Sequence, residues 1–201
     1  MKIQNRIPQF NEGLHKELID NGWTPLKEPN NISTAILASI PFMIGAGLFS
    51  FWMLNLLLPF SLKEFGIEDD GVMITIHPGI ILSFLLLLII HELLHLVLIP
   101  NFLRSDNTLI GLTWFGGFVA TEEKIPKCRF ILITLAPFVI ISIIIPLILS
   151  AFGLLTTLLK ILILINSLAS SVDLLNFLLV SKQVPKNAIL VSNGPRTYWR
   201  M

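Results

Sequence analysis

The chain carries one short motif whose residue types and spacing could bind a metal ion. His91, Glu92 and His95 form the pattern H-E-x-x-H. Residues four apart on an α-helix lie on the same face, so both imidazoles can reach one metal. Glu92 follows about 100° around the helix, close enough to act on a water molecule without being a ligand. A haem site is excluded, because two histidines one turn apart on one helix cannot be the opposite axial ligands of an iron.

The composition indicates what kind of element carries this motif. Of the 201 residues, 54% are hydrophobic and only 13% are charged, and the mean hydropathy is +0.79. Soluble proteins have about a quarter charged residues, so these values indicate a membrane protein. The net charge of +1, with basic residues spread along the chain, argues against a nucleic-acid partner. The single cysteine, Cys128, excludes an internal disulfide framework.

Four continuous apolar segments follow a polar stretch of 33 residues. In that stretch, Asn11 is expected to cap a short helix that ends near Asn21. A bilayer-spanning helix needs about 20 apolar residues, so we predict an all-α membrane protein with about four transmembrane helices in one polytopic domain, residues 1–201. The expected spans are residues 34–60, 78–100, 130–149 and 154–180.

The distribution of Lys and Arg predicts the orientation of these spans, because short cytoplasmic loops retain positive charge. The segment between the first and second spans has only Lys63. We therefore predict that both termini are cytoplasmic, and that Lys160, near the outer end of the fourth span, extends to the membrane interface. The other basic residues fall on the three predicted cytoplasmic segments: Lys2, Arg6, Lys16 and Lys27; Arg104, Lys124, Lys127 and Arg129; and Lys182, Lys186, Arg196 and Arg200.

Apart from Lys160, the ionisable residues within the predicted spans are His91, Glu92, His95 and Asp173. Each costs roughly 2.5–3.5 kcal/mol at the centre of a transmembrane helix, which argues against a chance occurrence of the motif. A catalytic zinc takes three protein ligands and a water, and Asp173 could be the third ligand. The two histidines lie about 7–14 Å from the inner end of their span and Asp173 about 10 Å from the inner end of its own. Their depths therefore match.

Alternatives to this ligand set stay open. Asp173 could instead pair with a polar neighbour on another helix. His77 could be the third ligand, although it lies at the outer boundary of its span, about 21 Å along the helix from His91. His15 lies in the polar N-terminal segment and is a weaker candidate.

Two further polar residues share a stripe of the fourth span with Asp173. Asn166 and Ser170 precede it at spacings of seven and three residues. Asn166 could hold a substrate carbonyl or the developing oxyanion, and Ser170 could be an outer-shell partner of the metal site. Interhelical hydrogen bonding is the alternative for both residues.

The connection between the second and third spans, residues 101–129, is unusually apolar for a cytoplasmic loop. Residues 108–114 and 118–121 are rich in β-formers and flank Phe115, Gly116 and Gly117, which suggests a short β-hairpin. Such a hairpin could lie against the metal site and add a peptide to its edge as a further strand. The alternative is a hairpin that only covers the cavity.

Taken together, these residues resemble a small bacterial membrane family of unknown function whose members are named as zincin peptidases. The resemblance covers nearly the whole chain. It rests on four segments: Gly22-Trp23-Thr24-Pro25-Leu26-Lys27-Glu28-Pro29, His91-Glu92-Leu93-Leu94-His95, Leu135-Ala136-Pro137, and Asn166 followed by Asp173. More distantly, the plan is similar to the site-2 protease class of intramembrane metalloproteases, in which an H-E-x-x-H helix and an aspartate from a later helix hold zinc.

The resemblance implies that His91, His95 and Asp173 bind Zn²⁺ and that Glu92 is the catalytic base. One feature departs from the site-2 pattern: no glycine or proline adjoins Asp173 to break the helix. The implied function is zinc-dependent hydrolysis of a membrane-embedded or juxtamembrane peptide in the bacterial cell membrane. The alternative is a non-proteolytic zinc-binding membrane protein, a transporter, sensor or structural adaptor, which has no need of Glu92.

Overall fold

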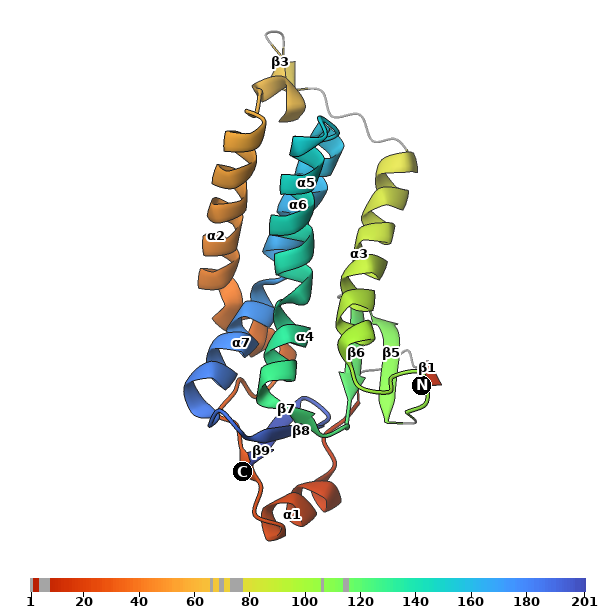
Figure 1. Ribbon diagram of the computed structural model, residues 1–201, viewed down its shortest axis with the longest axis vertical. Helices are drawn as coiled ribbons and strands as arrows, with labels where there is room; N and C mark the ends of the chain where they lie inside the picture. The colour runs from red at the N-terminus through yellow and green to blue at the C-terminus, as the bar shows by residue number, and fades with distance from the viewer. Residues whose placement is uncertain are drawn as a thin grey trace.

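Four helical columns run along the long axis of the computed structural model, with most of the β-structure and both chain termini at one end (Figure 1). The structure describes residues 2–3, 8–65, 67–68, 71–72, 78–105, 107–113 and 116–201. The helices are α1 (Glu12–Asp20), α2 (Ile32–Leu57), η1 (Leu62–Phe65), α3 (Pro78–Leu98), α4 (Lys127–Val139), η2 (Ile140–Ile144), α5 (Ile145–Ala151), α6 (Thr157–Ala169) and α7 (Ser171–Gln183). The strands are β1 (Lys2–Ile3), β2 (Thr24–Pro25), β3 (Ile67–Glu68), β4 (Gly71–Val72), β5 (Thr108–Thr113), β6 (Gly116–Thr121), β7 (Ile125–Pro126), β8 (Ile189–Asn193) and β9 (Arg196–Arg200).

Among the described residues, three helical segments are long and apolar enough to cross a membrane: Ile32–Leu57, Pro78–Leu98 and Lys127–Ala151. Helices α6 and α7 would make a fourth span if they are taken together. Large apolar side chains such as Leu37, Leu48, Trp52 and Leu82 are at least 60% exposed on α2 and α3. Apolar surface of this extent is unfavourable in water, so these faces suit contact with lipid.

The third span is continuous but not uniform. It passes from α-helix to the π-helical segment η2 and back to α-helix between Lys127 and Ala151. A π-helical turn is wider than an α-helical turn, and such turns often occur at functional sites. Pro137 lies inside α4, just before this change.

The prediction of one continuous fourth helix is wrong. Helix α6 ends at Ala169, α7 begins at Ser171, and their axes differ by 41°. At the break, both the backbone N–H and the side-chain hydroxyl of Ser170 donate to the carbonyl oxygen of Asn166, each at 2.9 Å. A serine hydroxyl that bonds back to the preceding turn bends helices, which explains a break without glycine or proline beside it.

The predicted hairpin between the second and third spans is confirmed as β5 paired antiparallel with β6. Residues 114–115, at its tip, lie outside the described residues. Strand β1 pairs in parallel with β5, so β6 forms one edge of this three-stranded sheet. A shorter pair, β3 and β4, lies at the opposite end of the molecule (Figure 1).

The all-α prediction missed a second sheet. Strands β8 and β9 form a C-terminal hairpin, and β2 and β7 flank it in the order β2-β9-β8-β7. Its turn contains Gly194 with φ +57°, a conformation that glycine adopts without strain. The sheet therefore joins the N-terminal segment, the entry to the third span and the C-terminal segment.

The best-packed apolar residues hold this end of the molecule together. Helix α1 is capped by Asn11 as predicted, since its side chain accepts from the N–H of Leu14 at 3.1 Å. Leu18 of α1 packs with Trp23, Val191 and Tyr198. A second cluster joins the end of α7 to the sheet: Leu26, Val180, Val184, Ala188 and Leu190.

Lys160, which was expected to extend to the membrane interface, is buried against the segment that follows α2. Its side chain is completely buried, and its Nζ lies 2.6 Å from Oε2 of Glu64. Lys160 also donates to the carbonyl of Pro59 at 3.2 Å and lies over the Phe60 ring, 4.2 Å from its centroid. The ammonium group forms an ion pair with a nearby carboxylate and hydrogen bonds with backbone carbonyl oxygens, so it does not need contact with water.

Candidate metal centre

The H-E-x-x-H motif occupies the last third of α3, at the end of the bundle that carries the sheets. His91 is buried, and Glu92 and His95 are partly buried. The imidazole centroids of His91 and His95 are 5.1 Å apart and the ring planes meet at 74°. Their one-turn spacing therefore brings both rings to one face of the helix, as the sequence predicts.

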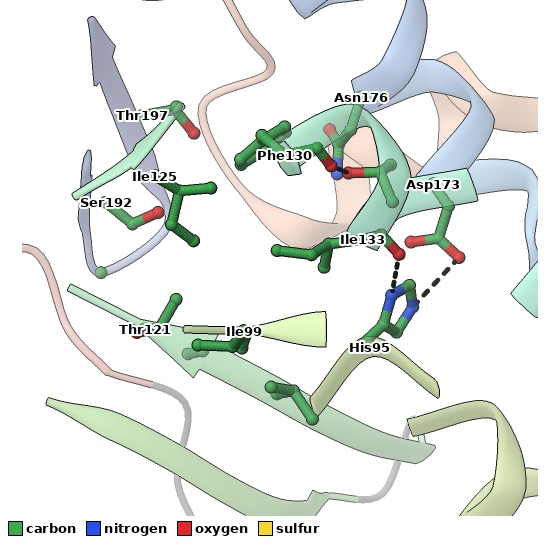
Figure 2. Close-up of a pocket in the computed structure, with 14 residues that line it drawn as sticks. His95, Ile99, Thr121, Ile125, Phe130, Ile133, Asp173, Asn176, Ser192 and Thr197 are labelled. Atoms are coloured by element: carbon green, nitrogen blue, oxygen red, sulfur yellow. Dashed lines mark hydrogen bonds and ion pairs between the residues drawn. The ribbon is translucent and has the colours of Figure 1, made fainter. Parts of the chain in front are cut away.

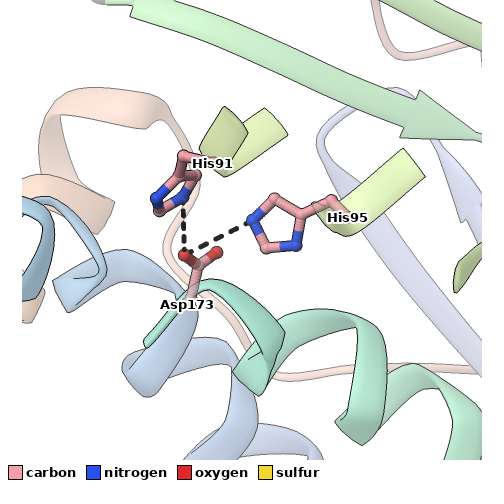
Figure 3. A group of neighbouring side chains, drawn as sticks. All are labelled: His91, His95 and Asp173. Carbon is pink, nitrogen blue, oxygen red and sulfur yellow. Dashed lines mark ion pairs between the residues drawn. The ribbon is translucent and has the colours of Figure 1, made fainter. Parts of the chain in front are cut away.

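Asp173 reaches this face from α7 (Figure 3). Its Oδ2 atom lies 3.4 Å from Nε2 of His91 and 3.5 Å from Nε2 of His95. The break at Ser170 places Asp173 in the first turn of a new helix. Unpaired N–H groups at a helix N-terminus favour a negative charge, so the break itself stabilises the carboxylate.

The spacing of these three atoms can be compared with a zinc site. Zinc–nitrogen and zinc–oxygen bonds of about 2.0–2.2 Å in a tetrahedron place neighbouring ligand atoms roughly 3.3–3.6 Å apart. Both His–Asp separations, 3.4 and 3.5 Å, fall in that interval. One carboxyl group and two imidazoles are also a donor set that zinc accepts in proteins. The residues present therefore fit a zinc ion.

Each histidine is oriented through its other ring nitrogen. Nδ1 of His95 lies 2.8 Å from the backbone carbonyl oxygen of Ile133 on α4. A carbonyl oxygen can only accept, so Nδ1 of His95 carries a proton, and Nε2 is the ring nitrogen that faces Asp173. Metal-binding histidines commonly have this arrangement.

The second histidine is held by Asn166. Its Oδ1 atom lies 2.9 Å from Nδ1 of His91. The amide nitrogen of Asn166 donates to the carbonyl oxygen of Pro137 at 3.1 Å and to Oγ of Ser142 at 2.9 Å. The Pro137 contact fixes which end of the amide is which, so His91 also donates from Nδ1 and presents Nε2 to Asp173.

These contacts decide between the two roles considered for Asn166. The side chain is 1% exposed and both amide hydrogens are used inside the protein, so neither is free for a substrate carbonyl or an oxyanion. The geometry favours the outer-shell role. Ser170 bonds the Asn166 backbone at the helix break and makes no described contact with a candidate ligand.

Glu92 lies beside the three candidate ligands and is not one of them. Strand β6 passes directly over it: a Cβ atom placed on Gly117 would lie 2.5 Å from Cγ and 3.2 Å from Oε1 of Glu92. Only a glycine allows this approach. The sequence predicted the glycine as part of a turn and gave no indication of this contact.

The other two histidines lie apart from the site or outside the description. Nδ1 of His15 lies 2.7 Å from the hydroxyl oxygen of Tyr198, in the cluster of α1 and the C-terminal hairpin. His77, the rival third ligand, lies outside the described residues. Among the described residues, His91, His95 and Asp173 form the group whose ligand atoms approach within 4.8 Å of one another.

Two cavities meet at His95 and Asp173. The larger, of about 580 Å³, lies between α2, α3, β6 and the α6–α7 break, and Ile36, Met43 and Leu88 are among its many apolar lining residues. The smaller, of about 230 Å³, extends from His95 and Asp173 towards the C-terminal hairpin (Figure 2). Its lining includes the polar residues Thr121, Thr134, Asn176, Ser192 and Thr197.

The three candidate ligands come from an H-E-x-x-H motif on one apolar helix and an aspartate on another helix. The chain matches the family described as "Putative zincin peptidase" over residues 84–189, which is 106 of its 201 residues. It belongs to that family, which confirms the first resemblance. The matched region includes the motif, the β5–β6 hairpin and Asp173. No curated protein and no solved structure matches the chain.

Proposed function

We propose that this protein is a zinc-dependent protease that cleaves peptide bonds within or next to the lipid bilayer, with His91, His95 and Asp173 as the metal ligands. The observation that carries the proposal is a carboxylate, Glu92, beside three converging ligand atoms where an apolar and a polar cavity meet. The family assignment supports peptidase activity in general.

In this proposal, each residue of the site has a separate role in hydrolysis. Bound zinc supplies a Lewis acid that makes a nearby water more acidic and polarises the scissile carbonyl. Glu92 takes a proton from the attacking water and delivers it to the leaving amine. Asn166 and the Ile133 carbonyl keep the two histidine rings in one tautomer and one orientation.

The two cavities favour separate routes for substrate and water. The larger cavity exceeds the volume of a few side chains and is mainly apolar, which suits a segment of a membrane-embedded or juxtamembrane peptide. The smaller cavity has hydroxyl and amide groups along its wall and leads away from the apolar helices. Peptide hydrolysis consumes water, and the polar cavity is the better path for it.

The free edge of β6 is the proposed binding surface for the substrate backbone. Strand β6 has β5 on one side only, and Gly117, Phe118 and Val119 line the larger cavity. An extended peptide could add to this edge as a further strand, next to Glu92. Addition of a strand would present the peptide backbone in the unfolded form that cleavage requires.

The proposed location is the bacterial cell membrane, with several spans and both termini in the cytoplasm. The basic residues near the sheets support this orientation. Cys128 is exposed at the start of α4 and can report it. A membrane-impermeant thiol reagent should label Cys128 in inside-out vesicles and leave intact cells unlabelled. Labelling in intact cells would reverse the orientation.

The alternative is a zinc transporter, sensor or adaptor. Such a protein needs the ligands, but it has no use for a carboxylate that lies next to them without joining them. The close packing of Gly117 against the Glu92 side chain therefore favours a catalytic role for Glu92 over a protein that only stores or transports zinc.

The deciding experiment replaces Glu92 with glutamine. Glu92→Gln keeps the size of the side chain but cannot accept a proton, and general-base catalysis is worth about 10²–10⁴-fold. We expect bound zinc to remain and cleavage of single-span membrane peptides, measured with and without chelator, to collapse. Glu17→Gln, on the exposed side of α1, is the matched control. A folded, zinc-loaded Glu92→Gln protein with wild-type activity would rule out the mechanism.

A further inference from the structure

The starting observation is a proline inside the helix that faces both candidate histidine ligands. Pro137 lies in α4, where the N–H of each residue normally donates to the carbonyl four residues earlier. Proline has no N–H, so the carbonyl of Ile133 loses this donor. In the structure, that carbonyl oxygen accepts from Nδ1 of His95 at 2.8 Å. A hydrogen bond that the helix cannot make is thus replaced by one to a candidate ligand.

The carbonyl group of the same proline serves the other histidine. It accepts from the amide nitrogen of Asn166 at 3.1 Å, and Oδ1 of Asn166 accepts from Nδ1 of His91 at 2.9 Å. The π-helical segment that follows carries Ser142, which holds the same amide nitrogen at 2.9 Å. The part of the third span around Pro137 therefore holds the amide nitrogen of Asn166, and this leaves the amide oxygen directed at His91.

We propose that Pro137 is a positioning residue that sets the tautomer and orientation of both His91 and His95. Its missing N–H leaves the Ile133 carbonyl for one ring, and its own carbonyl directs Asn166 to the other. Both rings then donate from Nδ1 and turn Nε2 towards Oδ2 of Asp173, at 3.4 and 3.5 Å. The inference rests on the proposed function only in the reason why the rings need this orientation. The hydrogen bonds that orient the rings are present whether or not the protein is an enzyme.

The test restores the missing donor. In Pro137→Ala, the new N–H at position 137 can bond the Ile133 carbonyl within the helix and compete with His95. We expect a folded protein of equal or greater thermal stability, because alanine is a far better helix residue than proline. Zinc affinity should fall by about 10–100-fold, the usual cost of losing an outer-shell partner. A merely structural role would instead lower stability and leave the affinity of the folded fraction unchanged.

The matched control is Pro41→Ala. Pro41 is also a proline inside a membrane helix, α2, and no described hydrogen bond connects it to a histidine. Its replacement should leave zinc affinity within about twofold of wild type. Competition with a zinc chelator in detergent measures the affinity of all three proteins.

A second readout uses the apoprotein and requires neither zinc nor substrate. Nitrogen-15 NMR of labelled histidine distinguishes a proton on Nδ1 from one on Nε2, and His91→Gln and His95→Gln assign the two signals. Wild type should show Nδ1–H at both rings, and Pro137→Ala should lose this preference at His95. A wild-type ring that lacks a proton on Nδ1, or a Pro137→Ala protein with unchanged histidine signals and zinc affinity, would overturn the proposal. Correct tautomers in a protein that cleaves nothing would refute the proposed function and leave this inference intact.

Discussion

A single methyl group at Gly117 should displace the proposed general base without disturbing the metal. In Gly117→Ala, the added carbon would lie 2.5 Å from Cγ of Glu92. Carbon atoms in contact prefer about 3.5–4.0 Å, so one of the two must retreat by about 1 Å or more. The side chain of Glu92 is flexible and only partly buried, whereas β6 is held by its ladder to β5. We expect Glu92 to move.

The size of the effect follows from that displacement. A misplacement of about 1 Å in a catalytic group can cost about 10²-fold in rate. Stability should not fall, because Gly117 lacks a positive φ and alanine is favoured over glycine in a strand by about 0.5–1 kcal/mol. Zinc content should also be unchanged, since Glu92 is outside the ligand group.

The assay compares cleavage of a single-span membrane peptide, zinc content and thermal unfolding in the same preparations. Gly79→Ala is the matched control, because Gly79 lies on the helix of the motif and a Cβ there meets nothing within 4 Å. Wild-type cleavage by a folded Gly117→Ala protein would refute the close approach of β6 to Glu92. Loss of zinc together with activity would show that β6 supports the ligands rather than the base.

Three further changes test other parts of the structure. Asp173→Ala should weaken zinc binding by more than about 100-fold in chelator competition, since even the loss of a residue that only hydrogen-bonds a ligand costs about 10–100-fold. His15→Ala should leave zinc affinity unchanged. Full zinc affinity without Asp173 would remove it from the ligand set. Lys160→Met should lower the free energy of unfolding by about 1–3 kcal/mol, because it leaves the partly buried carboxylate of Glu64 without its cation. Exposed Lys63→Met should not lower it, and equal stability of the two variants would contradict this ion pair. Burial raises the pKa of Glu28 to about 7 from 4.5, so the folded chain keeps a proton that the unfolded chain has released, and the stability of the fold should decrease as the pH rises from about 4.5 to 7. Thermal unfolding of Glu28→Gln should show a smaller decrease over this pH range. An identical pH profile for the variant and wild type would contradict the burial of Glu28.

The features predicted from the sequence are those that local chemistry determines. Continuous apolar segments lead to helices, because the backbone must satisfy its own hydrogen bonds in lipid. The pattern of β-formers and glycines before Thr121 gave the hairpin. Matching depths of His91, His95 and Asp173 anticipated that the three would meet, because two parallel columns bring residues of equal depth together.

The structural features that the sequence analysis missed depend on contacts between residues far apart in the chain, or on a turn motif that the analysis did not consider. The break at Ser170 arises from a hydroxyl bond in a segment with no glycine or proline. The buried position of Lys160 requires Glu64, about a hundred residues earlier. A proline frees a carbonyl wherever it occurs in a helix, but only the folded structure tells which donor takes it. By contrast, the Gly194-Pro195 pair, which forms the two-residue turn between Asn193 and Arg196, was a readable signal for the C-terminal hairpin.

The order of strands in the four-stranded sheet has a consequence for biosynthesis. Strands β2 and β7 are joined only through β8 and β9, which the ribosome makes after all the helices. Roughly 75 residues separate the end of β7 from the end of β9, or about 4–15 s of bacterial translation at 5–20 residues per second. During that interval Ser192 and Thr197 are not yet present to wall the polar cavity. The wall of the polar cavity can therefore be completed only after the helices that precede β8 and β9 have been made.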